Sequence, residues 1–136
     1  MSSEFLERVR PSGIVTTEHI PDVASGCETS ERTAREGAEI IRRIRDRDFL
    51  ILLRDDGKEL NSGAFASYLS RAITDAAGRV VFVIGGAWGV SDSVKQRADD
   101  CLSMSRMTFT HEMCFLFLTE QIYRAFSILG GSGYHH

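Results

Sequence analysis

The sequence predicts an α/β fold in which helices cover both faces of a parallel β-sheet. Two apolar runs, at 49–53 and 80–84, are long enough for buried strands and too short for helices. Helical patterns separate these runs and follow them along the chain. Strands that are apolar throughout and alternate with helices are typical of a parallel sheet buried on both faces.

The bulk composition predicts one globular domain over residues 1–136. Hydrophobic residues make up 43% and charged residues 26% of the chain, which argues against disorder. A net charge of −3 excludes a protein that coats nucleic acid by charge alone, so an RNA target requires a local basic patch or a larger assembly. Cys27, Cys101 and Cys114 have no disulfide or metal spacing, and no apolar run reaches membrane-spanning length. These features predict a cytoplasmic protein with no membrane segment and no metal.

The first half of the chain contains two predicted helices and two predicted strands. A short helix is expected at 4–10, ended by Pro11 and Gly13, and β-branched residues predict a strand at 14–20. Apolar residues recur at helical spacing over 31–47. The arginines near the end of this helix suit the negative pole of its dipole, and we interpret them as a solvated face rather than an RNA-binding patch. After the strand at 49–53, the residues Asp-Asp-Gly-Lys at 55–58 predict a turn.

The second half continues the alternation. Ser62 is expected to cap a helix that Gly78 ends, and Ser91 to cap another that runs to about residue 100. The segment 102–109 has the composition of a strand, but its alternation slips, which indicates a bend or loop. The last helix is predicted at 111–128. Its residues 113–118 are apolar nearly all round, so we expect its first half to be buried.

Gly85, Gly86 and Gly89 follow a buried strand and precede a helix, where missing side chains let a ligand approach the backbone. Their Gly-Gly-x-x-Gly spacing is neither that of a dinucleotide-binding turn nor that of a phosphate-binding loop. A tight turn that binds no ligand explains these glycines about as well. Trp88 inside the loop must either pack or stack on a flat group.

Polar residues near the C-terminus have two interpretations each. His111 starts the last helix and suits either catalysis or a helix-start hydrogen bond. His111 and Cys114 lie one turn apart, but two ligands are too few for zinc. Arg124 can bind phosphate, although a solvated arginine is the commoner role. The terminal His135 and His136 also fit the remnant of a purification tag.

Several blocks of sequence form a distinctive series, FVIGGAWGVS at 82–91, LSMSRMTFTH at 102–111, EQIYRAF at 120–126, and finally Tyr134-His135. These blocks resemble the RlmH (YbeA) family of 23S rRNA pseudouridine methyltransferases. Their order and gaps match the family, which is far more specific than the glycines alone. LLRDDGKELNS at 52–62 resembles the family's Leu-acidic-x-x-Gly-Lys segment, and residues 31–45 match more loosely.

This resemblance implies a SPOUT α/β-knot fold, in which the C-terminal part forms a trefoil knot, and a homodimer. It also implies S-adenosyl-L-methionine as methyl donor and N3 of a pseudouridine in 23S rRNA of assembled ribosomes as target. Recognition of an assembled ribosome suits a chain that is not strongly basic. A sulfonium methyl group is already activated, so the protein mainly aligns the nucleophile with it.

The resemblance also assigns residues to the site, position by position. The implied catalytic and RNA-facing residues are His111, Tyr123, Arg124, Tyr134 and His135, and His111 or a tail residue is the candidate base for the N3 proton. The slip at 102–109 then marks a knotted cofactor loop rather than a defective strand. The residues implied to bind the cofactor are Leu53, Gly85, Gly86, Gly89, Met104, Ser105, Arg106, Met107, Thr108 and Phe109.

Some positions depart from the family pattern. The acidic residue usual after Leu53 is Arg54, and the proline usual before the histidine is Thr110. An arginine usual four residues after the histidine is Phe115, and the usually basic last residue is His136. The family's opening strand, with its Val-Gly-Lys-like turn, has no counterpart, so the chain is expected to be short at its N-terminus and its first strand is in question. The residues of the cofactor loop are thus retained, whereas fewer charged residues occupy the positions that the family turns toward RNA.

Three functions remain open on the sequence. The first is an rRNA methyltransferase, which binds S-adenosyl-L-methionine and methylates ribosomal pseudouridine. The second is a SPOUT-fold ribosome- or RNA-binding relative with weakened or lost catalysis, which binds without turnover. The third is a Rossmann-like nucleotide binder, which an unknotted structure favours.

Overall fold

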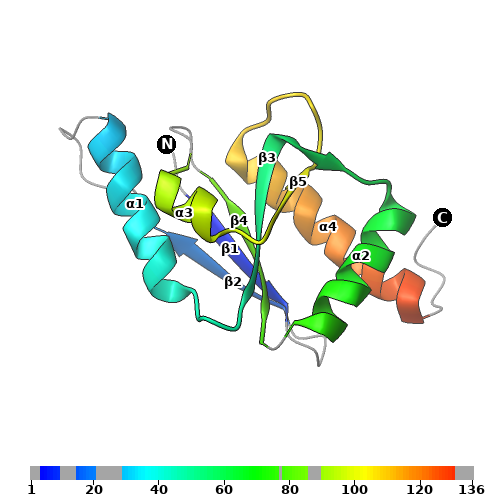
Figure 1. The fold of residues 1–136 in the computed structure, drawn as a ribbon. Helices are drawn as coiled ribbons and strands as arrows, with labels where there is room; N and C mark the ends of the chain where they lie inside the picture. Colours follow the sequence, from blue (N-terminus) through cyan, green and yellow to red (C-terminus); the bar gives the residue numbers. More distant parts are fainter. Residues whose placement is uncertain (1–3, 10–14, 21–28, 77, 86–89, 131–136) are drawn as a thin grey trace.

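The computed structural model describes residues 4–9, 15–20, 29–76, 78–85 and 90–130. Within these residues five strands form one sheet in the order β2-β1-β4-β3-β5 (Figure 1). The strands are β1 (Glu4–Val9), β2 (Val15–Ile20), β3 (Phe49–Glu59), β4 (Val80–Ile84) and β5 (Asp100–Ser103). The helices are α1 (Thr29–Arg43), α2 (Ser62–Asp75), α3 (Asp92–Arg97) and α4 (His111–Gly130).

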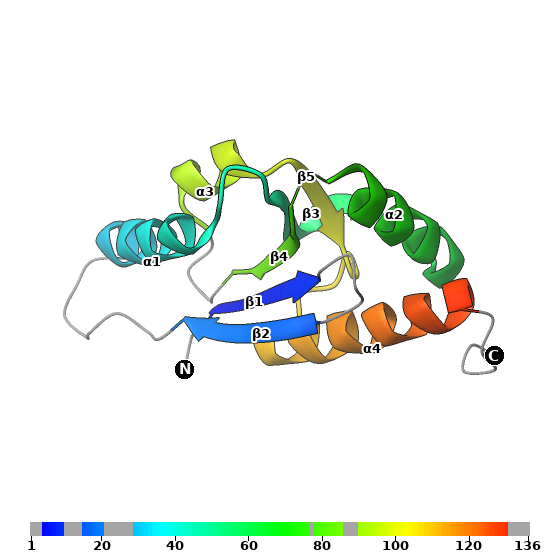
Figure 2. The same ribbon diagram turned by 90° about the horizontal axis from the view of Figure 1, so that it is seen from below.

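The centre of the sheet is parallel and is covered on both faces, as the sequence predicts. β3 lies between β4 and β5, and Leu53 of β3 pairs with Ile84 of β4 and Leu102 of β5. α1 and α3 pack on one face, and α2 and α4 pack on the other (Figures 1 and 2). Because side chains alternate along a strand, Leu50 and Leu52 face α1 and α3, whereas Ile51 and Leu53 face α2 and α4.

The N-terminal part of the chain corrects one expectation. Residues 4–9 form a strand rather than a helix, and this strand pairs antiparallel with both β4 and β2. Glu4 opposes Ile20, and Val9 opposes both Val15 and Val80. A helix of six or seven residues is marginal by itself, whereas a strand between two neighbours satisfies its backbone hydrogen bonds on both sides. The place beside β4 is therefore filled, although by an antiparallel strand.

Several predicted boundaries shift by a few residues. The helix expected to end at 47 ends at Arg43, and the cap of α2 is Asn61 rather than Ser62, since the Asn61 side chain accepts a hydrogen bond from the Ala64 amide. Ser91 caps α3 as expected, but this helix ends at Arg97. The segment 102–109, interpreted as a bend or loop, holds only the end of β5, which stops at Ser103.

The turn predicted at 55–58 is also wrong. β3 continues through these residues to Glu59, and its pairing with β5 is interrupted, because Leu53 and Lys58 both oppose Leu102. Gly57 makes the irregularity possible. A Cβ atom at this position would lie 2.6 Å from the carbonyl carbon of Leu102, so only glycine lets the two backbones approach this closely.

The first half of α4 is less buried than its sequence suggests. Leu118 is buried, but the side chains of Met113 and Leu116 are exposed at 42% and 58%. Tyr123 lies on the same side of the helix at 57% exposure. This side of α4 therefore exposes apolar side chains in the described structure. Of the helices within the described residues, none has the length and apolar character that crossing a membrane requires.

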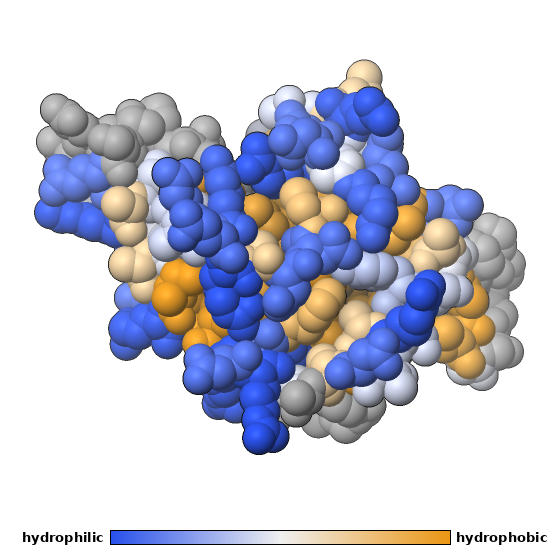
Figure 3. Space-filling model, viewed as in Figure 1, coloured by the Kyte–Doolittle hydropathy of each residue, from blue (hydrophilic) through white to orange (hydrophobic). Residues whose placement is uncertain are grey.

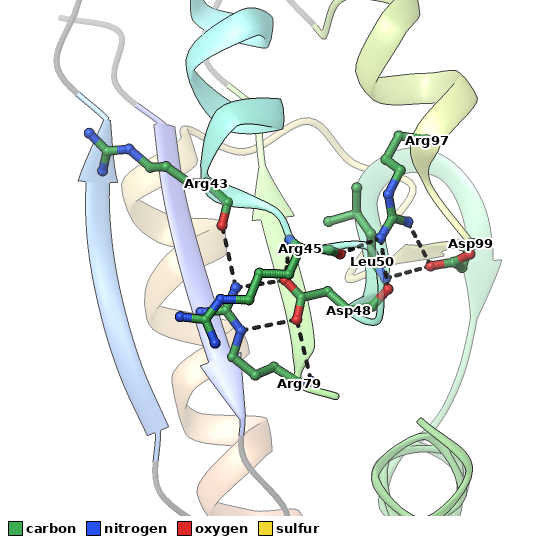
Figure 4. A network of polar contacts seen from close by, with 7 residues as sticks. All are labelled: Arg43, Arg45, Asp48, Leu50, Arg79, Arg97 and Asp99. Atoms are coloured by element: carbon green, nitrogen blue, oxygen red, sulfur yellow. Dashed lines mark hydrogen bonds and ion pairs between the residues drawn. The ribbon is translucent and has the colours of Figure 1, made fainter. Parts of the chain in front are cut away.

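The amino-terminal edge of the parallel strands carries a polar network. Asp48, Arg79 and Asp99 each precede one parallel strand and are linked through one another and through Arg97 (Figure 4). Arg79 donates from Nε to Asp48 Oδ1 at 3.0 Å and from Nη2 to Asp48 Oδ2 at 2.6 Å, with both side chains buried. Arg97 donates to the backbone oxygen of Asp48 at 2.8 Å and pairs with Asp99. This network fixes the starting points of β3, β4 and β5.

Candidate functional site

A cavity of about 680 Å³ opens at the opposite, carboxyl-terminal edge of the same strands. Leu53 and Ile84 are paired residues near the ends of the β3–β4 ladder, and both line it. The other wall is the loop 104–110, which joins β5 to α4 and lies at the top of Figure 1. A crevice beyond the carboxyl ends of parallel strands is where α/β proteins bind ligands, and this volume suits a small organic molecule.

The cavity brings together seven of the ten residues that the sequence assigns to the cofactor. Gly86 and Gly89 lie outside the described residues. Arg106 does not line the cavity, because its Nε pairs with Glu59 Oε1 at 2.6 Å. The seven lining residues are Leu53, Gly85, Met104, Ser105, Met107, Thr108 and Phe109.

Side chain to backbone hydrogen bonds shape the loop 104–110. The Ser103 hydroxyl, at the end of β5, donates to the backbone oxygen of Ser105 at 2.8 Å. The Ser105 hydroxyl in turn accepts from the Met107 amide at 3.0 Å. Phe109 packs edge-on against Phe117 of α4, with ring centroids 5.2 Å apart. The slipped alternation at 102–109 is therefore the end of a strand followed by a tethered loop.

His111 stands where this loop becomes α4. Its side chain is buried and also lines the cavity, and its Nε2 lies 2.8 Å from Glu112 Oε1. Thr110 caps the helix by accepting a hydrogen bond from the Met113 amide, so the threonine supplies a capping group that a proline cannot. A nitrogen base thus borders the cavity at a helix start.

Both described cysteines have a raised pKa. Burial raises the pKa of the Cys114 thiol, which lines the cavity. Burial, together with the nearby Asp56 carboxylate, raises the pKa of Cys101. Both thiols stay protonated at neutral pH, and a thiol attacks only as its thiolate. The cavity is therefore better suited to aligning a ligand than to forming a covalent intermediate.

Charged groups also line the cavity. Arg54 and Lys95 both line it, as does Asp55. Sequence reasoning noted Arg54 only as a departure from the family and missed Lys95 and Asp55. The helical spacing of α3 could not reveal that Lys95 lines the same cavity as Leu53 and Arg54 of β3, because this position depends on how α3 packs on the sheet.

Of the other residues predicted for the site, those that the structure describes do not line this cavity. Arg124 pairs with Glu120 at 2.7 Å along α4, one turn away, and Tyr123 is exposed. Tyr134 and His135 lie outside the described residues, as does Trp88. Within the described part of the chain, no cluster of three or more His, Cys, Asp or Glu residues is arranged to hold a metal ion.

A second cavity, of about 510 Å³, lies across the loop from the first, between the N-terminal end of α2 and α4. Met104, Ser105 and Phe109 line both cavities, so the loop is a partition between them. Ser62 donates to Gln121 Oε1 at 2.7 Å and joins α2 to α4 beside this cavity.

Comparison with known proteins agrees with this fold. A family model described as predicted SPOUT methyltransferase matches residues 1–135. The chain belongs to the SPOUT methyltransferase family, and the predicted family and fold are confirmed at this level. Whether the chain is knotted stays a prediction.

Several relatives share one name, ribosomal RNA large subunit methyltransferase H. The relative from Porphyromonas gingivalis is 40% identical over 137 residues, which cover 99% of this chain and 87% of that protein. The relative from Christiangramia forsetii is 40% identical over 121 residues, covering 88% of this chain and 77% of that protein. The relative from Nitratidesulfovibrio vulgaris is 37% identical over 135 residues, covering 99% and 86%.

Proposed function

We propose that this chain transfers a methyl group from S-adenosyl-L-methionine to N3 of a pseudouridine in 23S rRNA of assembled ribosomes. It acts as one domain, as a homodimer, in the cytoplasm. The observation that carries the proposal is the cavity at the carboxyl edge of β3 and β4, walled by the loop 104–110. The names of the relatives supply the large-subunit rRNA as the class of substrate.

The residues that line the cavity fit the proposed cofactor. Leu53, Ile84, Met107 and Phe109 offer apolar and polarisable surface for a flat adenine ring. Gly85 and Ser105 bring backbone groups to the same space, where they can bind ribose and ring nitrogens. When bound, the cofactor supplies a methyl group on a positively charged sulfur. The chain holds and orients this group and keeps water away from it.

His111 is the residue proposed to face the target base. Among the predicted catalytic residues that the structure describes, it is the one that lines the cavity, and its ring can take the proton that leaves N3. Arg124, Tyr134 and His135 complete the proposed RNA-facing set. Because Arg124 lies along α4, away from the cavity lining, its proposed role is contact with RNA from one protomer of the dimer.

The exposed side of α4 is the proposed contact between protomers. Met113, Leu116 and Tyr123 form an apolar stripe that is exposed in the described part of the chain. Replacing Leu116 with Glu should convert the dimer to monomers in light scattering after size exclusion, with little change in the unfolding of the monomer. Thr74→Glu, at an exposed position of α2, is the matched control. A wild-type monomer at micromolar concentration would contradict this part of the proposal.

Binding and turnover test the proposal in two steps. Titration calorimetry should show S-adenosyl-L-methionine binding to the protein, and radiolabelled methyl should appear on ribosomes that lack the modification. Absence of cofactor binding at millimolar concentration would overturn the proposal. Binding without methyl transfer would identify a relative that has lost catalysis.

A pair of cavity variants tests the role of His111. His111→Asn should lower kcat strongly while leaving the Kd of the cofactor within a few-fold, because the ring acts on the target rather than on the cofactor. Cys114→Ser, in the same cavity wall, should leave kcat close to that of the wild type. Equal effects of the two variants on kcat would show that His111 has no catalytic role.

A further inference from the structure

Arg54 and Lys95 stand on a ridge between the large cavity and a smaller one of about 360 Å³. Both side chains line both cavities, although one comes from β3 and the other from α3. Arg54 is two residues after Leu52, so it faces the α3 side of the sheet, where Val94 of α3 packs on Leu52. Two cations from different elements therefore border one space. The surface around β3 and β5 mixes hydrophilic and apolar side chains (Figure 3).

The two cations differ in how they are held. Asp56 grips Arg54 through two contacts, Nε to Oδ1 at 2.9 Å and Nη2 to Oδ2 at 3.0 Å. These contacts fix the guanidinium plane and leave other N–H donors of its five for a ligand. Lys95 makes no side-chain hydrogen bond or ion pair with any residue that the structure describes. An ammonium group in this position has its full bonding capacity to offer.

The charge balance favours the large cavity over the small one. Asp56, which pairs with Arg54, and Asp100, which pairs with Lys58, both line the small cavity and bring negative charge to it. Asp55 is the one carboxylate among the described residues that line the large cavity, and no ion pair joins it to Lys95, so the ammonium group can pair with an anion there. A polyanion such as an RNA strand would gain little electrostatic attraction from the small cavity, where carboxylates accompany the cations. A single anionic group would be attracted most strongly in the large cavity, beside Lys95.

We propose that Lys95, together with an Arg54 positioned by Asp56, binds the α-carboxylate of the methionine part of S-adenosyl-L-methionine. The assignment rests on the proposed function and adds the orientation of the cofactor. That carboxylate is the one anionic group of the molecule. Its place on the α3 side leaves the apolar surface of Met107 and Phe109, in the loop that leads to α4, for the adenine end.

The test compares two ligands that differ in this carboxylate. Calorimetry should use S-adenosyl-L-methionine and decarboxylated S-adenosylmethionine, which keeps the sulfonium and the ammonium. Lys95→Gln should weaken binding of the first ligand about tenfold, as expected for loss of one charge-assisted hydrogen bond, and leave the second unchanged. Arg54→Gln should act in the same direction. Arg71→Gln, at an exposed position of α2 away from the cavities, is the matched control.

The outcomes separate this assignment from the proposed function. If both ligands lose affinity equally in Lys95→Gln, or if neither does, the carboxylate assignment is overturned while cofactor binding stands. If Lys95→Gln weakens binding to ribosomes and leaves cofactor binding unchanged, the cations belong to the RNA and the assignment is also overturned. If the wild type binds neither ligand, the proposed function is overturned and the assignment with it.

Discussion

The two edges of the parallel sheet use polar residues in opposite ways. At the amino-terminal edge, Asp48, Arg79, Arg97 and Asp99 bind one another and the nearby backbone, and the Asp48–Arg79 pair is buried. At the carboxyl-terminal edge, Arg54, Lys95 and His111 line a cavity. The polar groups of the first edge therefore form hydrogen bonds within the protein, whereas those of the second edge are placed where a ligand can bind. The stabilising network and the candidate binding site lie at opposite ends of the same strands.

The largest expected effect comes from breaking the buried pair. Asp48→Ala leaves the guanidinium of Arg79 with less than its full set of partners, and loss of one partner from a buried ion pair costs about 3–5 kcal/mol. The measurement is the free energy of unfolding from denaturant titration. Asp46→Ala, at an exposed neighbouring position, is the control and should change little. A loss below about 1 kcal/mol would show that the two edges do not differ as described.

Acid should weaken the same edge. Although burial alone raises the pKa of Asp48, hydrogen bonds from Arg79 and from the Arg45 amide outweigh this effect and hold the pKa below its usual value. An unfolded aspartate titrates near pH ~3.9, so the stability that Asp48 contributes is complete above that range and is lost as pH falls through the folded pKa. Unfolding free energies measured between pH 7 and 2 should converge for wild type and Asp48→Asn at the acid end. A constant difference between them would contradict the assignment.

A backbone clash should perturb the carboxyl edge by an intermediate amount. Gly57→Ala places a Cβ atom against the Leu102 backbone, which cannot move aside as a side chain can, and overpacking of this kind costs about 1–3 kcal/mol. Gly63→Ala is a matched control, because its Cβ would meet nothing nearer than 3.6 Å in the first turn of α2. The Gly63 variant should be neutral or slightly stabilising in thermal unfolding.

The smallest expected effect concerns the start of α4. Thr110→Ala removes the hydroxyl that accepts from the Met113 amide and should cost about 1 kcal/mol. Because Thr110 also ends the loop 104–110, cofactor affinity should fall with it, which a purely stabilising cap far from the cavity would not cause. Thr74→Ala, at an exposed position of α2, is the control. If the cofactor affinity of Thr110→Ala is unchanged, the cap of α4 does not contribute to the position of the loop.

The sequence predicted the parts of this fold that depend on local pattern. The apolar runs at β3 and β4 and the cap at Ser91 were found because burial and capping leave signals over a few residues. The strand at Glu4–Val9 was missed, because its state depends on pairing with β4, more than 70 residues away in the sequence. The exposed stripe on α4 was missed for a related reason, since apolar composition does not show which chain covers a side chain.

The candidate site shows the same limit. Resemblance assigned Leu53, Gly85 and five residues of the loop 104–109 to the cofactor, and these residues line one cavity, while their role in binding stays a prediction. It also placed Arg106 there, although the structure directs this side chain to Glu59, because neighbouring residues of an irregular loop point in different directions. The position of Lys95 could not be predicted without knowing how α3 packs against the sheet. Contacts between elements are set by the whole fold and leave no local pattern.

The interrupted pairing of β3 with β5 has a consequence for how this protein can diverge. Since Leu53 and Lys58 share one partner on β5, the residues between them stand outside the ladder that joins the two strands. A new side chain at Arg54 or Asp55 can therefore change the charge of the cavity wall without loss of a hydrogen bond between these strands. Gly57 alone in this segment is constrained by its close approach to Leu102. The segment offers evolution, or an engineer, a place to alter ligand preference while the scaffold stays constant.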